Sequence, residues 1–151
     1  SIKNGSEVAR PLQRSLRNIM WEYGGVVKNK EKLQKGLSEI EGLKESSKNL
    51  DVRPDSEGYQ DLMLAFDLEA SIASSEATLK SALNREESRG AHQRDDFKDL
   101  SENGNVNIRV ELDDNKEIKL SKKEIPQLEK KLKNLINKTV EIDNFEGMLL
   151  E

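Results

Sequence analysis

Apolar residues recur at helical spacing in three stretches of the first 84 residues. In the first stretch they are Leu12, Leu16, Ile19, Met20 and Tyr23. Residues three and four apart share one face of a helix, so this spacing predicts an amphipathic helix. We expect it to begin near Pro11, because the first turn of a helix needs no donor from the N–H group that proline lacks. The pair Gly24-Gly25 predicts its end.

Two further helices follow. Asn29 is a good capping residue for a helix whose apolar face holds Leu33, Leu37, Ile40 and Leu43. The turn before it is short, which predicts an antiparallel pair with the first helix. A polar linker ending at Pro54-Asp55-Ser56 precedes the third helix, expected from about Gly58 to Asn84. Its apolar and small residues cover a wide arc, as in a helix packed on two sides, so we interpret it as the central rod of a three-helix bundle.

The periodicity changes after residue 100. Apolar residues then alternate with polar ones at Val106, Ile108, Val110 and Leu112. This alternation predicts a half-buried strand, and Ile118 and Leu120 continue it after the turn Asp113-Asp114-Asn115, so we expect a β-hairpin. Helical spacing returns at Leu128, Leu132, Leu135 and Ile136. We place this amphipathic helix from Pro126 to about Val140, because the residue before a proline is biased away from helical conformation.

These elements predict a mainly α protein. The predicted fold is a three-helix bundle, spectrin-like with up-down-up order, followed by a β-hairpin and a C-terminal amphipathic helix. We divide the chain into a helical bundle at residues 8–100 and an appendage at residues 101–151. Of the 151 residues, 36% are charged, 34% hydrophobic and 4% aromatic. Such a composition suits long amphipathic helices better than a thick sheet core.

Composition and charge exclude several classes of function. The chain has no cysteine, which excludes disulfides and cysteine-ligated metals within it. No apolar run approaches the roughly 18 residues of a membrane span. We therefore expect a soluble, cytoplasmic protein without direct membrane insertion, associated with a membrane only through a complex. The net charge of −4 and the scarcity of aromatic residues speak against nucleic acid as a partner. Arg10, Arg14 and Arg17 are interpreted as a solvated helix face.

One segment, Arg85 to Phe97, departs from this helical patterning. It holds the only histidine, three arginines, four acids and a glycine. His92 has three interpretations: a general acid or base beside those acids, a hydrogen-bonded structural residue, or a surface residue. We favour a role without catalysis. Ser88 has no plausible catalytic triad in this chain. One imidazole with scattered carboxylates gives no ligand spacing that selects a metal.

The arginines of this segment, together with His92, are also a candidate anion site for a carboxylate. The four acids make the segment about neutral, so its charges can pair internally. Gly90 is expected to supply a sharp bend. We therefore interpret the segment as a rigid, salt-bridged docking loop and assign no catalytic, cofactor-binding or metal-binding residue. The candidate docking residues are Arg85, Ser88, Arg89, Gly90, His92 and Arg94.

The same segment, with Ser-Ala-Leu at 81–83 before it, closely resembles a stretch of the flavoprotein subunits of succinate dehydrogenase and fumarate reductase. Those proteins carry Glu-Ser-Arg-Gly-Ala-His-x-Arg at the end of a long helix, and here that sequence runs from Glu87 to Arg94. The first helix and the turn Gly24-Gly25-Val26-Val27 resemble the family too. The resemblance covers about residues 8–100 and extends to the hairpin. L-aspartate oxidase shares this architecture and is the related alternative.

The resemblance implies a C-terminal helical domain that packs beside an FAD-binding domain and near an iron–sulfur electron-transfer subunit. The family's FAD fold and its substrate-binding residues lie in parts absent here, so no catalytic residue carries over. No Gly-rich dinucleotide fingerprint follows a strand in this sequence. The implied function is a non-catalytic domain that buttresses the flavin domain of an FAD-dependent succinate dehydrogenase or fumarate reductase, with FAD only in the parent enzyme.

Residues 121–151 have no counterpart that we can place in that family. Their apolar stripe needs a partner, which makes a free-standing helical interaction module the alternative from a different class. A small hydrolase that uses His92 is the least favoured interpretation.

Overall fold

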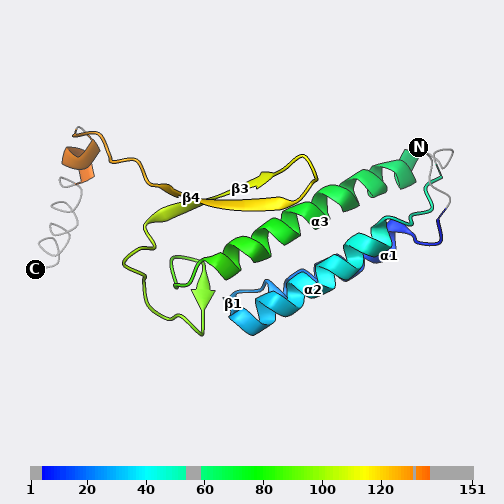
Figure 1. The fold of residues 1–151 in the computed structure, drawn as a ribbon, viewed down its shortest axis with the longest axis horizontal. Helices are drawn as coiled ribbons and strands as arrows, with labels where there is room; N and C mark the ends of the chain where they lie inside the picture. Colours follow the sequence, from blue (N-terminus) through cyan, green and yellow to red (C-terminus); the bar gives the residue numbers. More distant parts are fainter. Residues whose placement is uncertain (1–4, 54–58, 131, 137–151) are drawn as a thin grey trace, which may run out of the picture.

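Three helices lie side by side in up-down-up order and form the bundle that the sequence predicts (Figure 1). They are α1 (Ala9–Tyr23), α2 (Lys30–Ser47) and α3 (Gln60–Asn84). The computed structural model describes residues 5–53, 59–130 and 132–136. The predicted linker Pro54-Asp55-Ser56 and the predicted start of the third helix at Gly58 lie outside these residues. None of the helices described is long and apolar enough to cross a membrane.

Helix α1 buries the side that its apolar spacing predicts. Ala9, Leu12 and Leu16 are buried. The arginines of the opposite face are exposed, as predicted. The helix begins two residues before Pro11, which keeps the proline within the first turn, where no intrahelical partner for its missing N–H exists. It ends at the predicted glycines, where the Gly24 N–H donates to the Met20 carbonyl at 3.0 Å.

Helix α2 begins with the predicted cap. The Asn29 Oδ1 accepts a hydrogen bond from the Lys32 N–H at 2.9 Å, which satisfies one of the donors left free in the first turn. Gly36 lies where α2 approaches both other helices. A Cβ at this position would come within 2.7 Å of the Tyr23 Cβ and 2.8 Å of the Leu79 Cδ1. The absence of a side chain at Gly36 therefore permits the close packing of the bundle.

Helix α3 lies between two partners. The α1–α2 pair covers one side of it, and the hairpin runs along another (Figure 1). Its most buried apolar residues, Leu68, Ile72 and Leu79, face the core. The wide apolar arc is not covered throughout, because Met63 and Phe66 are 60% and 65% exposed.

A buried carboxylate links α3 to α2. Glu76 is 6% exposed and bonds Lys44 of α2 at 3.1 Å and Lys80 of its own helix at 2.6 Å. Burial opposes ionisation of Glu76, but the two ammonium groups outweigh burial, and the pKa of Glu76 is lowered. The pair Lys44–Glu76 thus joins two helices through a charged group that remains satisfied inside the bundle.

The predicted β-hairpin is confirmed as strands β3 (Val106–Leu112) and β4 (Ile118–Glu124), which pair antiparallel with Val110 opposite Leu120. The Asp113 Oδ1 accepts from two backbone N–H groups of the turn at 2.9 Å. Ile118 is buried. The predicted apolar face is covered only in part, because Leu112 is 58% exposed.

The C-terminal helix begins later than predicted. Residues 125–129 have no regular secondary structure, and helical conformation is described at residues 130 and 132–136. The prediction of a start at Pro126 is therefore wrong. Leu128 and Leu132 are about half exposed, so tertiary packing does little to stabilise a first turn at Pro126. The predicted continuation to Val140 lies outside the described residues.

Candidate functional site

The segment from Arg85 to Phe97 returns from the end of α3 to the connection between α1 and α2. Its strand β2 (Gln93–Arg94) pairs in parallel with strand β1 (Val27–Lys28). The Asp95 N–H extends the pairing by donating to the Lys28 carbonyl at 3.0 Å. Two parts of the chain that are distant in sequence, the α1–α2 connection and the segment that follows α3, therefore meet at one end of the bundle.

The sharp bend predicted at Gly90 is confirmed. Gly90 has φ +56°, a backbone conformation that residues with a side chain adopt at a cost. Arg89 and His92 exchange two backbone hydrogen bonds across the bend, at 2.8 and 2.9 Å. The bend places Gly90 and Ala91 at the surface.

Arg94 is 2% exposed and closes the C-terminal end of α3. Its Nη1 donates to the carbonyl of Ala82 at 2.8 Å and to that of Arg85 at 3.1 Å. The last carbonyls of a helix have no partner within the helix, and its negative dipole end attracts a cation. The Phe97 ring lies 4.8 Å from the guanidinium carbon, within the range of a cation–π contact.

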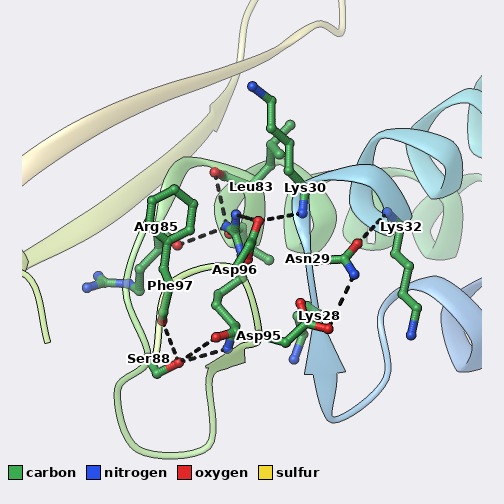
Figure 2. A network of polar contacts seen from close by, with 12 residues as sticks. Lys28, Asn29, Lys30, Lys32, Leu83, Arg85, Ser88, Asp95, Asp96 and Phe97 are labelled. Atoms are coloured by element: carbon green, nitrogen blue, oxygen red, sulfur yellow. Dashed lines mark hydrogen bonds and ion pairs between the residues drawn. The ribbon is translucent and has the colours of Figure 1, made fainter. Parts of the chain in front are cut away.

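Asp96 connects Arg94 to the start of α2. Its two oxygens accept from Arg94 Nε and Nη2, both at 2.7 Å, in a bidentate pair. The same carboxylate accepts from the Lys30 N–H at 2.8 Å, in the first turn of α2 (Figure 2). Arg94, ahead of the Lys30 N–H, lowers the pKa of Asp96 to about 2.

Ser88 holds the segment closed. Its Oγ accepts from the Arg94 N–H at 2.9 Å and lies 2.8 Å from the Phe97 carbonyl, to which its hydroxyl can donate. The Ser88 N–H donates to the Asp99 carbonyl at 3.1 Å. The side chain is thus engaged with backbone groups of its own segment.

A second ion cluster joins the segment to the hairpin. Glu87 is 1% exposed and accepts from Arg89 Nε at 3.1 Å and Arg85 Nη1 at 2.5 Å. It also accepts from the Ser101 N–H at 3.0 Å. Arg89 foremost, with the Ser101 N–H and Arg85, outweighs burial and lowers the pKa of Glu87 to about 2. Arg85 reaches further, since its Nη2 donates to the Val106 carbonyl at the start of β3 at 2.7 Å.

The ring of His92 has a backbone partner. Its Nε2 lies 3.2 Å from the Arg85 carbonyl. Burial is the main cause that lowers the pKa of His92, and the nearby cations Lys28, Arg94 and Arg85 lower it further. These interactions favour a neutral, hydrogen-bonded imidazole.

The structure brings all six predicted docking residues into one network, but with different exposure. Arg94 is buried, and Ser88 and Arg85 bond backbone groups, whereas the Arg89 side chain is 40% exposed. Sequence reasoning missed the role of Asp96 at the start of α2, because its partner Lys30 lies 66 residues earlier. It also missed Gly36, for which helical spacing gives no signal.

The chain is similar to several known proteins. A family model described as "Fumarate reductase flavoprotein C-term" matches residues 13–145. The match includes residues 121–145, so the expectation that residues 121–151 have no counterpart in the family is wrong for that part. An uncharacterized FAD-dependent oxidoreductase of Methanocaldococcus jannaschii is 35% identical over 99 residues, which are 66% of this chain and 18% of that protein. One subunit of the fumarate reductase (CoM/CoB) of Methanothermobacter marburgensis is 33% identical over 64% of this chain and 18% of its own length.

An L-aspartate oxidase of Acinetobacter baylyi is also related, with 34% identity over 58% of this chain and 15% of its own. Among solved structures, Sdh1 of Mycobacterium smegmatis in complex with UQ1 matches with a TM-score of 0.75 and 26% identity, over 83% of this chain and 22% of that one. The chain thus spans about a fifth or less of the length of these proteins. The chain belongs to the family formed by the C-terminal part of fumarate reductase and succinate dehydrogenase flavoproteins.

Proposed function

We propose that the chain is the non-catalytic C-terminal domain of an FAD-dependent succinate dehydrogenase or fumarate reductase flavoprotein. In this role it buttresses the flavin-binding domain of the same polypeptide and contacts an iron–sulfur electron-transfer subunit. FAD belongs to the parent enzyme, which is cytoplasmic and reaches a membrane only through its complex. The family membership and the names of the relatives support the parent activity.

An exposed apolar surface beside β2 carries the proposal of buttressing. Trp21 is 86% exposed and Val26 is 76% exposed. Val27, 52% exposed, pairs with Gln93 in the candidate docking loop, so the apolar surface adjoins that loop. Clustered apolar side chains of this kind mark surfaces that bind another protein surface.

The network beneath the loop suits it to docking. Arg94 and Asp96 are held by ionic hydrogen bonds to each other, and Glu87 by ionic hydrogen bonds from two arginines of the same segment. A loop whose shape is already determined loses little conformational entropy when it binds. Arg89 and the bend at Gly90 are then presented on a rigid base.

The fluorescence of Trp21 tests whether this surface binds the flavin-binding domain, because Trp21 is the only tryptophan of the chain. The chain is mixed with the separately expressed flavin-binding domain of its parent polypeptide, and tryptophan emission of the chain and co-elution are measured. We expect co-elution and a shift of the Trp21 emission to shorter wavelength, after correction for the emission of the flavin domain. Val26→Asp should weaken the association about tenfold or more, since a charge would be buried at the contact.

Met63→Asp is the matched control, because Met63 is 60% exposed and lies in the first turn of α3, whereas the segment that pairs with β1 follows the last turn of α3. Separate elution, or equal weakening by both variants, would argue against buttressing through this surface. The purified chain should show no flavin absorbance and no oxidation of succinate. Bound flavin would refute the assignment of FAD to the rest of the parent enzyme.

L-aspartate oxidase is a second candidate for the parent enzyme, favoured by the 34% identity of the Acinetobacter baylyi protein. Turnover of L-aspartate but not of succinate by the whole polypeptide would select it. A free-standing interaction module is favoured by the half-exposed Leu128 and Leu132. The sequence encoded upstream of Ser1 distinguishes this module from a flavoprotein domain.

A further inference from the structure

A groove of about 460 Å³ lies between the middle and end of α3, strand β3 and the end of β1. Lys28, Arg85 and His92 line it together with the apolar side chains of Ile108 and Val110. Within the part of the chain that the structure describes, no aspartate or glutamate lines it. The groove therefore combines basic groups and an apolar wall, in a chain whose net charge is −4.

The charge of Lys28 is not neutralised by a carboxylate within the part of the chain that is described. Its Nζ donates to the Val26 carbonyl at 3.2 Å, a neutral partner. Burial lowers the pKa of Lys28, as expected for a cation that loses water without gaining an anion. Arg85 differs, because Glu87 and two carbonyls occupy its guanidinium. Lys28 is thus the group that an incoming anion would neutralise.

His92 adds a donor that depends on protonation. In the neutral ring, an Nε2–H that donates to the Arg85 carbonyl leaves only a lone pair on Nδ1. A proton on Nδ1 would give the ring a positive charge and a second donor. The cations Lys28, Arg85 and Arg94 around the ring oppose that proton, and an anion in the groove would offset them.

We propose that this groove binds the oxyanion of a small organic acid or phosphate ester, with Lys28 and His92 on the charged end and Ile108 and Val110 against the apolar body. The volume lies in the range of small-molecule sites, which pair an apolar lining with a few polar groups. Carboxylate and phosphate present the same oxyanion chemistry to Lys28. The groove shares Arg85 and His92 with the candidate docking loop, but Trp21 and Val26, on which the docking test depends, do not line it. The two proposals can therefore be tested independently.

His92 reports directly on the proposal, because it is the only histidine and gives one imidazole signal in NMR spectra. The pKa of His92 is measured in the 151-residue chain with and without phenyl phosphate or benzoate, at matched ionic strength. We expect the bound anion to raise the pKa of His92, because negative charge stabilises the imidazolium. Benzyl alcohol, which has the apolar body without the oxyanion, should leave it unchanged.

Lys28→Gln tests whether the Lys28 ammonium group binds the anion. We expect this variant to weaken binding of the anion roughly tenfold, the loss typical of a hydrogen bond to a charged group. Lys32→Gln removes the same charge from the exposed side of α2 and should bind like the wild type. A larger effect of phenyl phosphate than of benzoate, or the reverse, would identify which of the two oxyanions the groove prefers.

Two results would overturn the proposal. One is a pKa of His92 that changes with neither phenyl phosphate nor benzoate, or that rises by the same amount in sodium chloride of equal ionic strength. The other is equal affinity of the Lys28→Gln variant and the wild type.

Discussion

Arg94 and Asp96, two residues apart in the sequence, join the ends of two helices. The Arg94 guanidinium donates to carbonyls at the end of α3, and the Asp96 carboxylate accepts from the first turn of α2. Their own bidentate bonds, at 2.7 Å each, connect these two contacts. Each charge lies at the helix end whose dipole attracts it. The pair therefore holds one end of the bundle together without a contribution from the apolar core.

Removing Arg94 tests this relationship. Arg94→Ala leaves the Asp96 carboxylate without its cation and the end of α3 without its donor. Breaking a buried ion pair costs roughly 3–5 kcal/mol, and we expect about 3 kcal/mol because the Asp96 side chain is 28% exposed. Urea unfolding measures the loss in the free energy of unfolding. Arg10→Ala, on the exposed face of α1, should change it by less than about 0.5 kcal/mol.

Two glycines of α2 form a matched pair for the packing of the bundle. Gly36→Ala would place a methyl group against Tyr23 and Leu79, and overpacking of this kind costs about 1–3 kcal/mol. The Cβ added by Gly42→Ala has none of the described atoms within 4 Å, and this substitution should stabilise the helix by up to about 1 kcal/mol. We therefore expect thermal midpoints to move in opposite directions. Stabilisation by both substitutions would show that the helices are not tightly packed at Gly36.

Substitution of Gly90 tests how much the positive φ at the bend contributes to stability. A Cβ there meets no atom of the described residues within 4 Å, so only the positive φ opposes a side chain. Gly90→Ala should lower the free energy of unfolding by about 1–2 kcal/mol, and Gly90→Asn should cost less because asparagine tolerates this conformation better. Equal losses in chemical denaturation would contradict this explanation.

Acid should weaken the protein through Glu87 and Asp96. The pKa of each is about 2 in the folded chain, below the ordinary values of 4.5 and 3.8. Below these ordinary values the unfolded chain takes up protons that the folded chain does not, so stability falls as the pH decreases. The contribution of the two carboxylates is fully present above about pH 4.5 and is lost progressively towards pH 2.

Urea unfolding at successive pH values measures this loss. We expect Glu87→Gln to reduce the slope of stability against pH in the acid range, because it removes one of the two groups. Glu86→Gln, which changes the exposed neighbouring carboxylate, is the control and should retain the slope of the wild type. A variant slope equal to that of the wild type would assign acid sensitivity to other groups.

The sequence alone predicted the elements whose signals are local. The apolar spacing of α1 and α2, the Asn29 cap and the alternation of β3 each depend on residues within a few positions of one another. The same holds for the bend at Gly90. The C-terminal helix is the exception, because the predicted start at Pro126 lacked the packing that stabilises a first turn.

The resemblance of the Glu87–Arg94 stretch to a flavoprotein family was readable from the amino acids themselves, and the family match confirms it. The contacts that those residues make in the folded chain could not be predicted from the sequence. Arg94 and Asp96 act on helix ends that the chain brings together only when the bundle packs, and Lys30 lies 66 residues before Asp96. The groove at Lys28 likewise needs β1, α3 and β3 in place. Local spacing determines which segments become helices and strands, whereas hydrogen-bond partners across the bundle depend on how those segments pack.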